Sequence, residues 1–171
     1  MPFPELTRQV LQFYTDNGAP NESVWYAPWT TILTTLFPPT DGFLVAPQRK
    51  IIDEDENETT IPDFVIEVSR AIPGSLNLQI VLIVEIKNSH HWPDGADRLF
   101  TQISRQANSA FSQTARRRLY WVGVIGPHWR YGIKEDDGQL VLSPLIPWHD
   151  TTHDDASFND FQTLAGLVRA L

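Results

Sequence analysis

The stretch from Leu78 to Lys87 constrains the fold of this chain more than any other. Its middle, Ile80 to Val84, is apolar on both faces of an extended strand, and the ionisable Glu85 and Lys87 follow directly. A strand without a polar face is typical of the centre of a sheet that is covered on both sides. The run is far too short to cross a bilayer, so it predicts a buried central strand of a water-soluble fold.

Helical and extended patterns surround this strand. The predicted helices span residues 5–14, 21–36, 96–111 and 158–170, and Pro28 is expected to kink or split the second. The other predicted strands span residues 43–52, 61–69 and 120–125, followed by a hairpin of 129–134 with 139–142. The acidic run 53–58 is expected to form a loop, and Pro73-Gly74 is expected to separate two strands.

The order of these elements predicts the fold class. A helix, three strands, a helix and a strand follow one another (αβββαβ), and a C-terminal hairpin and helix come after them. We therefore expect an α/β protein with a central mixed β-sheet flanked by helices. At 171 residues with 42% hydrophobic content, the chain suits a single domain over residues 1–171 better than two.

Composition narrows the range of functions. The chain has no cysteine, which excludes disulfides, thiol nucleophiles and cysteine-bound metals, so any metal must bind oxygen or imidazole ligands. Residues 1–12 have neither the basic start nor the apolar core of a secretory signal. Without a signal or a membrane-spanning segment, we expect an intracellular protein, cytoplasmic or nuclear, that does not bind membranes.

The formal net charge of −8 bears on the choice of partner. Strong nonspecific binding of nucleic acid normally depends on Lys and Arg residues that neutralise phosphates, so this charge argues against it. Basic residues nevertheless gather in a few places, at Arg98, Arg105 and Arg116 to Arg118. Two interpretations stay open: a locally positive face, or charged clusters that are only solvated surface.

Three ionisable residues could meet at one edge of the predicted sheet. Strand alternation places Glu85 and Lys87 on the same side, and Asp63 lies near the start of the preceding strand. Two carboxylates with a backbone carbonyl and water would suit Mg²⁺ or Mn²⁺. The alternative is that Asp63 and Glu85 only face water and that Lys87 pairs with one of them. The position of Glu85 and Lys87 at the end of a buried strand favours a functional site.

These residues resemble a known signature. Ile61-Pro62-Asp63-Phe64, followed by Ile83-Val84-Glu85-Ile86-Lys87, is similar to the motif of the PD-(D/E)XK nuclease superfamily, over roughly residues 21–125. The resemblance implies a restriction-endonuclease-like fold. It also implies a metal-dependent nuclease that hydrolyses phosphodiester bonds of nucleic acid, with DNA as the expected substrate.

The resemblance assigns roles residue by residue. It implies that Asp63 and Glu85 bind Mg²⁺, which Mn²⁺ may replace, that the backbone carbonyl of Ile86 is a further ligand, and that Lys87 is the catalytic lysine. Many members add an acid from the first core helix, for which Glu22 fits better than Glu5. Some use a glutamine on the helix after the lysine strand, a part that Gln102 or Gln106 could take, although both could be ordinary helix surface residues.

Several alternatives remain beside this interpretation. His90 and His91 could contact a phosphate or be ordinary loop residues. Tryptophans such as Trp25, Trp29, Trp92 and Trp129 could stack on bases, although packing in the core or against a partner is their usual role. The chain could also be an inactive member of the fold that serves as a protein-binding or structural module, or a phosphoesterase for small substrates. Members that cut both strands often work as dimers, which brings a homodimer into consideration.

Overall fold

The computed structural model describes residues 3–52, 59–69 and 77–171. Two predicted features, the acidic loop 53–58 and the break at Pro73-Gly74, lie outside these ranges. Within them the chain forms helices, short 3-10 turns and a mixed β-sheet, and its chain order contains the predicted αβββαβ sequence of main elements.

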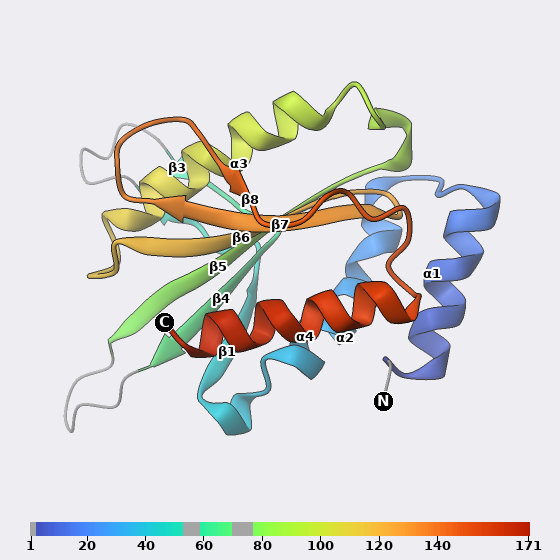
Figure 1. The fold of residues 1–171 in the computed structure, drawn as a ribbon, viewed down its shortest axis with the longest axis horizontal. Helices are drawn as coiled ribbons and strands as arrows, with labels where there is room; N and C mark the ends of the chain where they lie inside the picture. Colours follow the sequence, from blue (N-terminus) through green and yellow to red (C-terminus); the bar gives the residue numbers. More distant parts are fainter. Residues whose placement is uncertain (1–2, 53–58, 70–76) are drawn as a thin grey trace.

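A six-stranded sheet forms the centre of the molecule (Figure 1). Its strands lie in the spatial order β1-β4-β5-β6-β7-β8, and β5 and β6 are parallel whereas every other neighbouring pair is antiparallel. The strand bounds are β1 Phe43–Pro47, β4 Phe64–Ser69, β5 Leu78–Lys87, β6 Arg118–Ile125, β7 His128–Glu135 and β8 Ser143–Pro144. The predicted central strand is therefore β5, with a partner on each side.

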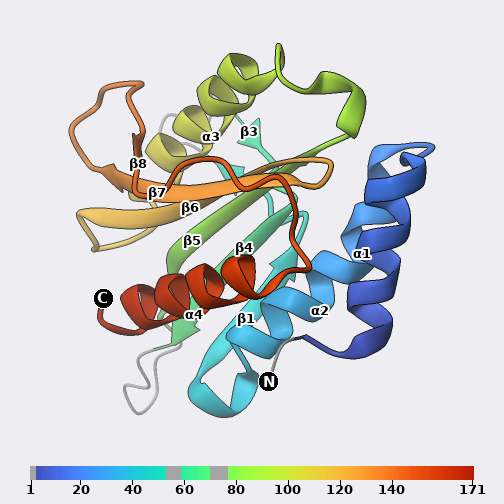
Figure 2. The same cartoon turned by 45° about the vertical axis from the view of Figure 1, so that its right-hand side comes forward.

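Helices cover both faces of this sheet. The connection from β5 to the parallel β6 runs through α3 (Ala96–Phe111), which lies on one face, as parallel neighbours require a crossover. On the opposite face lie α1 (Glu5–Asn17), α2 (Tyr26–Leu36) and α4 (Asp155–Arg169) (Figure 2). Within the described part of the chain, no helix is both long enough and apolar enough to cross a membrane.

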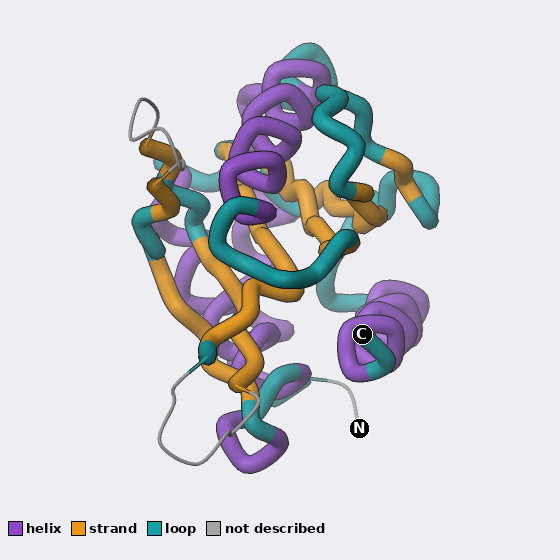
Figure 3. Tube along the Cα trace, turned by 90° about the vertical axis from the view of Figure 1, so that its left-hand side faces the viewer, coloured by secondary structure: helices purple, strands orange, loops and turns teal. Residues whose placement is uncertain are grey.

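The burial of β5 explains its sequence. Leu82, Val84 and Ile86 are fully buried in the core under α1, α2 and α4, and Ile83 is buried in the core under α3. A side view shows helical segments on more than one side of the strands (Figure 3). The mixed α/β fold class that the sequence predicts is confirmed.

Two predictions around the first core helix need correction. The segment 21–36 begins as a short 3-10 helix, η1 (Glu22–Trp25), before α2 starts at Tyr26. Asn21 caps η1, as predicted, because its side chain accepts a hydrogen bond from Ser23 N at 3.0 Å. Pro28 does not split the helix: it lies in the first turn of α2, where its missing N–H would have no helical partner in any case.

The strand boundaries also differ from the predictions. The segment 43–52 divides into β1 and the two-residue β2 (Ile51–Ile52), which pairs with β3 (Thr59–Thr60) outside the main sheet. The segment 61–69 becomes a strand only at Phe64. The second arm of the C-terminal hairpin is β8, not residues 139–142, since it is Pro144 and Ser143 that pair with Gly132 and Ile133.

Candidate active site

Asp63 lies where β4 and β5 part. The ladder between these strands ends at Phe64 and Val84, so Asp63 and Ile86 lie just beyond it. The Asp63 side chain takes the place of a strand partner there, and its Oδ2 accepts a hydrogen bond from Ile86 N at 2.6 Å. Lys87 O bonds to Gly126 N on the β6 side, and backbone groups alternate along a strand, so the Ile86 carbonyl faces the side of Asp63.

Glu85 is almost completely buried on the α3 side of β5, with 2% of its surface exposed. Its Oε1 accepts hydrogen bonds from Lys87 Nζ at 2.7 Å and from Gln102 Nε2. Its Oε2 accepts a hydrogen bond from Gln106 Nε2 at 2.8 Å. A buried carboxylate needs such partners, because its desolvation is costly, so three donors hold this one in a fixed orientation.

Two glycines let the neighbouring elements approach this end of β5. Gly123 pairs with Glu85 across the parallel ladder, and a Cβ there would lie 3.1 Å from a methyl carbon of Leu99 on α3. The close approach of α3 brings Gln102 and Gln106 within reach of Glu85. Gly126 adopts a φ of +59°, and a Cβ there would lie 2.5 Å from Ser89 Oγ, immediately after the end of β5.

Tyr26 joins the start of α2 to the site. Its hydroxyl lies 2.7 Å from Asp63 Oδ1 and 3.2 Å from Glu22 Oε1, and its ring packs edge-on against Phe64. A phenol has only one proton, so it can donate fully to only one of these carboxylates, and the shorter contact is with Asp63. Glu22 therefore approaches Asp63 through a shared hydroxyl, whereas Glu5 accepts a hydrogen bond from Gln9 along α1.

The charges of the site perturb one another. Burial, and then the negative charge of Glu85, raise the pKa of Asp63 to about 6, although hydrogen bonds from Ile86 and Tyr26 act in the opposite direction. Burial would lower the pKa of Lys87, but its hydrogen bond and charge contact with Glu85 outweigh burial and raise that pKa. Burial, followed by the Asp63 carboxylate, raises the pKa of Tyr26. Two carboxylates thus share a poorly solvated site with one ammonium.

The donor set fits a hard cation. Within residues 3–52, 59–69 and 77–171, no three His, Cys, Asp or Glu side chains are arranged to hold a metal ion. Asp63 and Glu85 with the Ile86 carbonyl supply only oxygen, and Mg²⁺ commonly binds one or two carboxylates and keeps several waters. The raised pKa of Asp63, caused in part by Glu85, indicates a surplus of negative charge that a cation would neutralise.

Two cavities flank these residues. One of about 480 Å³ is lined by Gln102 and Gln106 together with Arg98 and Arg105. The other, of about 240 Å³, is lined by Lys87 with His90 and His91, and it also contacts Arg98. Both glutamines thus connect Glu85 to the larger cavity, and both histidines border the space beside Lys87.

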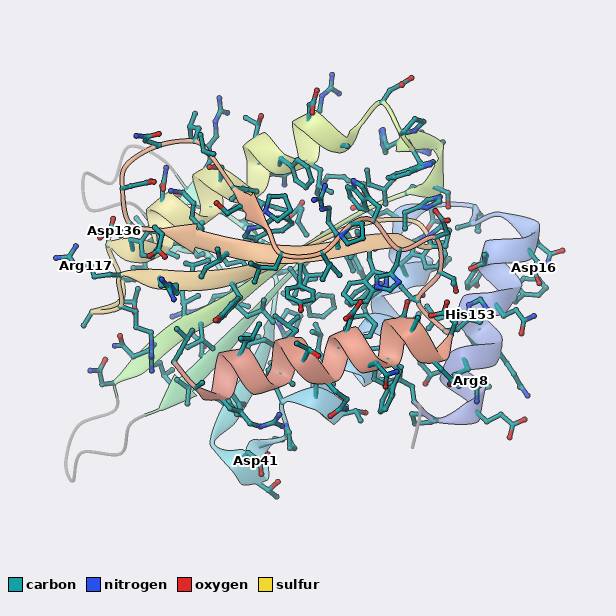
Figure 4. The ribbon with its side chains drawn as sticks, viewed as in Figure 1. Arg8, Asp16, Asp41, Arg117, Asp136 and His153 are labelled. Atoms are coloured by element: carbon teal, nitrogen blue, oxygen red, sulfur yellow. The ribbon has the colours of Figure 1, made fainter. Side chains whose placement is uncertain are left out.

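Other candidates lie elsewhere. Arg117 and Arg118 are at the opposite end of the sheet, where they form ion pairs with Asp136 and Glu135, and Figure 4 shows Arg117 beside Asp136 there. Arg116 donates to the carbonyl of Leu171 at 2.5 Å. The basic gathering expected from the sequence is therefore divided. The core role is confirmed for Trp25, Trp29 and Trp129, which are fully buried, whereas Trp92 is half-buried and stacks on His128 with ring centroids 3.9 Å apart.

Sequence reasoning missed Tyr26. The one available signal was its position four residues after Glu22, which places both side chains on the same helical face when the turn continues into a helix. Its contact with Asp63 joins residues that are 37 positions apart, and no local pattern predicts such a contact.

No protein-family model matches the sequence, and a comparison with curated protein sequences finds no significant match. Solved structures do show similar folds. The chain is similar to part of a structure described as a cryo-EM DrdV–DNA complex, with a TM-score of 0.53 and 12% identity over 94% of this chain and 13% of that chain. It is also similar to part of the type IIG restriction endonuclease BpuSI, with a TM-score of 0.59 and 14% identity over 86% of this chain and 17% of that chain.

At these identities the likeness concerns the fold alone. The chain spans less than a fifth of the length of either matched chain, so it corresponds to a part of each. The matches agree with the layout of a mixed sheet between helices. The chain has a restriction-endonuclease-like α/β fold.

Proposed function

We propose that this chain is a metal-dependent nuclease that hydrolyses phosphodiester bonds of DNA. The observation that carries the proposal is the convergence of Asp63, Glu85 and Lys87 at the end of β5. Asp63 binds the backbone N–H between the other two residues, and Lys87 binds Glu85 directly. The similarity of the fold to that of a restriction endonuclease supports the same interpretation.

The side chains have distinct roles in this proposal. Asp63 and Glu85, with the carbonyl of Ile86, would hold Mg²⁺, or Mn²⁺ in its place. A metal bound there would supply Lewis acidity and lower the pKa of a coordinated water. Lys87 would orient the attacking water and offset negative charge that develops on the phosphate oxygens. Gln102 and Gln106 would fix the Glu85 carboxylate, and Glu22 would add charge beside Asp63.

A cleavage assay tests the proposal. Wild-type protein, Asp63→Asn, Lys87→Met and the distant control Arg117→Gln would be incubated with circular and linear duplex DNA, single-stranded DNA and RNA. Each substrate would be tested with Mg²⁺, with Mn²⁺ and with a chelator. We expect metal-dependent products from wild type and Arg117→Gln that are lost in both site variants. Products that persist unchanged in Asp63→Asn would overturn the proposed site.

A second function is favoured by a specific observation. Among the described residues no third acidic side chain joins Asp63 and Glu85 in a group that could hold a metal, and the chain carries a net charge of −8, which opposes contact with a polyanion. Both features suit an inactive member of the fold that binds a protein. If folded wild-type protein cleaves no substrate with any metal, this module becomes the better proposal. A homodimer stays a prediction, and light scattering of the wild-type protein would test it.

A further inference from the structure

The larger cavity beside Glu85 has a composition that the catalytic proposal does not explain. Catalysis needs Gln102 and Gln106 only as donors to Glu85, yet both also line this cavity. Its volume of about 480 Å³ lies within the range of about 300–1,000 Å³ typical of small-ligand sites. The cavity could therefore hold one unit of a larger substrate.

The described residues that line the cavity carry positive charge although the protein is acidic. Arg98 and Arg105 both line it, and both are exposed on α3. The lining residues of the described chain include no Asp or Glu. Among residues 3–52, 59–69 and 77–171, neither guanidinium takes part in an ion pair, in contrast to Arg117 and Arg118. Two guanidinium groups without acidic partners suit a phosphate.

Two polar atoms of the cavity residues have no hydrogen-bond partner in the described structure. They are Gln106 Oε1, on a side chain with 2% exposure, and Thr60 Oγ1. Because Gln106 Nε2 is engaged by Glu85, its Oε1 can only accept a hydrogen bond, whereas the Thr60 hydroxyl can donate or accept. Both atoms are buried, and a ligand edge in the cavity could supply the partners that buried polar groups normally have once the two side chains turn towards it.

One wall of the cavity is apolar. Ile61 lines it and leaves 52% of its surface exposed. The flat face of a base could cover this side chain, and an arginine plane could stack on such a face as well. A phosphate, an apolar flat face and a hydrogen-bonding edge are together the features of a nucleotide.

We propose that this cavity binds one unpaired nucleotide of a single-stranded nucleic acid, beside the phosphodiester held at Asp63 and Glu85. Its phosphate contacts Arg98 and Arg105, its base lies on Ile61, and the base edge bonds to Thr60 and Gln106. This inference rests on the proposed nuclease function and specifies its substrate. A base within a duplex is stacked and paired, so it cannot enter the cavity unless it leaves the helix.

The acidic net charge agrees with such a mode of binding. A protein that grips duplex DNA along its backbone contacts many phosphates and loses affinity steeply with salt. Two arginines imply about two phosphate contacts, so binding should have a shallow salt dependence, with a log–log slope of roughly −1.4 at −0.7 per contact on a single strand. This mode requires only a local positive charge.

Binding can be measured without cleavage. Fluorescence anisotropy would follow labelled single-stranded DNA, the same sequence as RNA, and its duplex, in a chelator and at several salt concentrations. The variants are Arg105→Gln and Thr60→Val, and the matched controls are Arg117→Gln just before β6 and Thr163→Val on α4. Thermal unfolding of each variant would confirm that it is folded.

We expect single strands to bind at least ~10-fold more tightly than the duplex. Arg105→Gln should weaken single-strand binding by about 5–10-fold and make the salt slope shallower by roughly 0.7, since it removes one phosphate contact. Thr60→Val should weaken binding by about 2–5-fold with an unchanged slope, because it removes a hydrogen bond without a change of charge. The DNA and RNA arms show which sugar the cavity admits.

Other outcomes overturn the inference. If the duplex binds as tightly as the single strand, or if Arg105→Gln and Thr60→Val bind like their controls, the cavity does not hold a nucleotide. The failure of the proposed function is distinguishable from this result. If the protein binds single strands as expected but never cleaves them, the nucleotide-binding proposal stands and the nuclease proposal fails. If the protein cleaves DNA but the cavity variants bind like their controls, only the nucleotide-binding proposal fails.

Discussion

Each end of the sheet contains a lysine in an ion pair: half-buried Lys87 at the near end, beside the candidate site, and buried Lys134 at the far end, where Arg117 and Arg118 lie. At the far end Lys134, with no exposed side-chain surface, donates to Glu135 O at 2.6 Å and to Asp137 Oδ1 at 2.5 Å. Asp137 is 47% exposed, so water solvates it as well. At the near end Lys87 binds Glu85, which is only 2% exposed and lies close enough to Asp63 to affect its pKa.

The far end contains ion pairs whose acids are solvated, which a stable fold tolerates. The near end contains more negative than positive charge with little solvation, and this needs another explanation. The far end balances each cation with an acid that water reaches, as in the pairs of Arg117 and Arg118. The near end places the buried Glu85 and the half-buried Asp63 beside one ammonium, and burying unbalanced charge is costly. Stability alone does not account for such an arrangement, whereas the proposed site for a cation and a phosphate would.

The largest expected effect on cleavage comes from substitution of Lys87, with the same substitution of Lys134 as the comparison. Lys87→Met should lower the kcat/KM for metal-dependent cleavage by about 10²–10³-fold, because it removes a preorganised positive charge from the transition state. Lys134→Met should change it by less than about threefold. Steady-state cleavage of the best substrate measures both values. Equal losses of kcat/KM in the two variants would show that Lys87 has no particular role in cleavage, and the contrast between the two ends would fail.

Gln106→Met tests the support of Glu85. Methionine keeps the length of the side chain but leaves Glu85 Oε2 without its donor inside the protein. We expect a loss of about 1–3 kcal/mol in the free energy of unfolding and roughly tenfold weaker metal binding. Urea unfolding and titration calorimetry with Mn²⁺ measure the two quantities. Gln9→Met on the exposed face of α1 is the control. If Gln106→Met lowers stability and Mn²⁺ affinity no more than this control does, Gln106 does not support Glu85.

Most substitutions lower stability, but Asp63→Asn should become more stable relative to wild type as the pH rises. The folded-state pKa of Asp63 is raised from 3.8 to about 6, so its stabilising contribution is complete below pH 3.8 and is lost as the pH rises through 6. Without metal, the variant should therefore become more stable relative to wild type by about 1 kcal/mol between pH 5 and pH 8. Mn²⁺ affinity of wild type should fall as the pH drops below 6.

Urea unfolding in chelator at both pH values provides the test of this prediction. The asparagine side chain of the variant can still accept the hydrogen bond from Ile86 N, and Tyr26 can then donate to Glu22. A stability difference between variant and wild type that does not change with pH would show that Asp63 is well solvated. The surplus of negative charge at the near end would then no longer support a cation site there.

Much of this layout could be predicted from local patterns. The doubly apolar run of β5 indicated its central place, and alternation placed Phe64, Ile66 and Val68 in one core and Val65 in the other. The same strands led to the expectation that Asp63, Glu85 and Lys87 meet at one edge of the sheet, but the hydrogen bond between Asp63 and Ile86 N was not predicted. The catalytic roles of these residues, the metal and the single-domain organisation stay predictions.

The rest depends on contacts between distant segments. Tyr26 reaches Asp63 only because α2 packs against the start of β4, and the first residue of β4 is set by where its ladder with β5 ends. The basic cluster at Arg116 to Arg118 is close in sequence to Arg105 but lies beyond the end of α3, so helix length carries it to the opposite end of the sheet. Such distances become visible only when the elements are assembled.

The smallest expected effect is at the far end. Arg117 and Asp136 form an ion pair of 2.5 Å, but the arginine side chain is 86% exposed. Water solvates such a charge in the unfolded and folded states alike, so a double-mutant cycle with Arg117→Gln and Asp136→Asn should give a coupling below about 0.5 kcal/mol, and less at 1 M salt. The same cycle with Lys87→Met and Glu85→Gln should give a larger coupling that salt changes little, because the pair is shielded from ions. A far-end coupling equal to the near-end one would mean that burial does not distinguish the two ends, and the case for a functional site would then depend on cleavage alone.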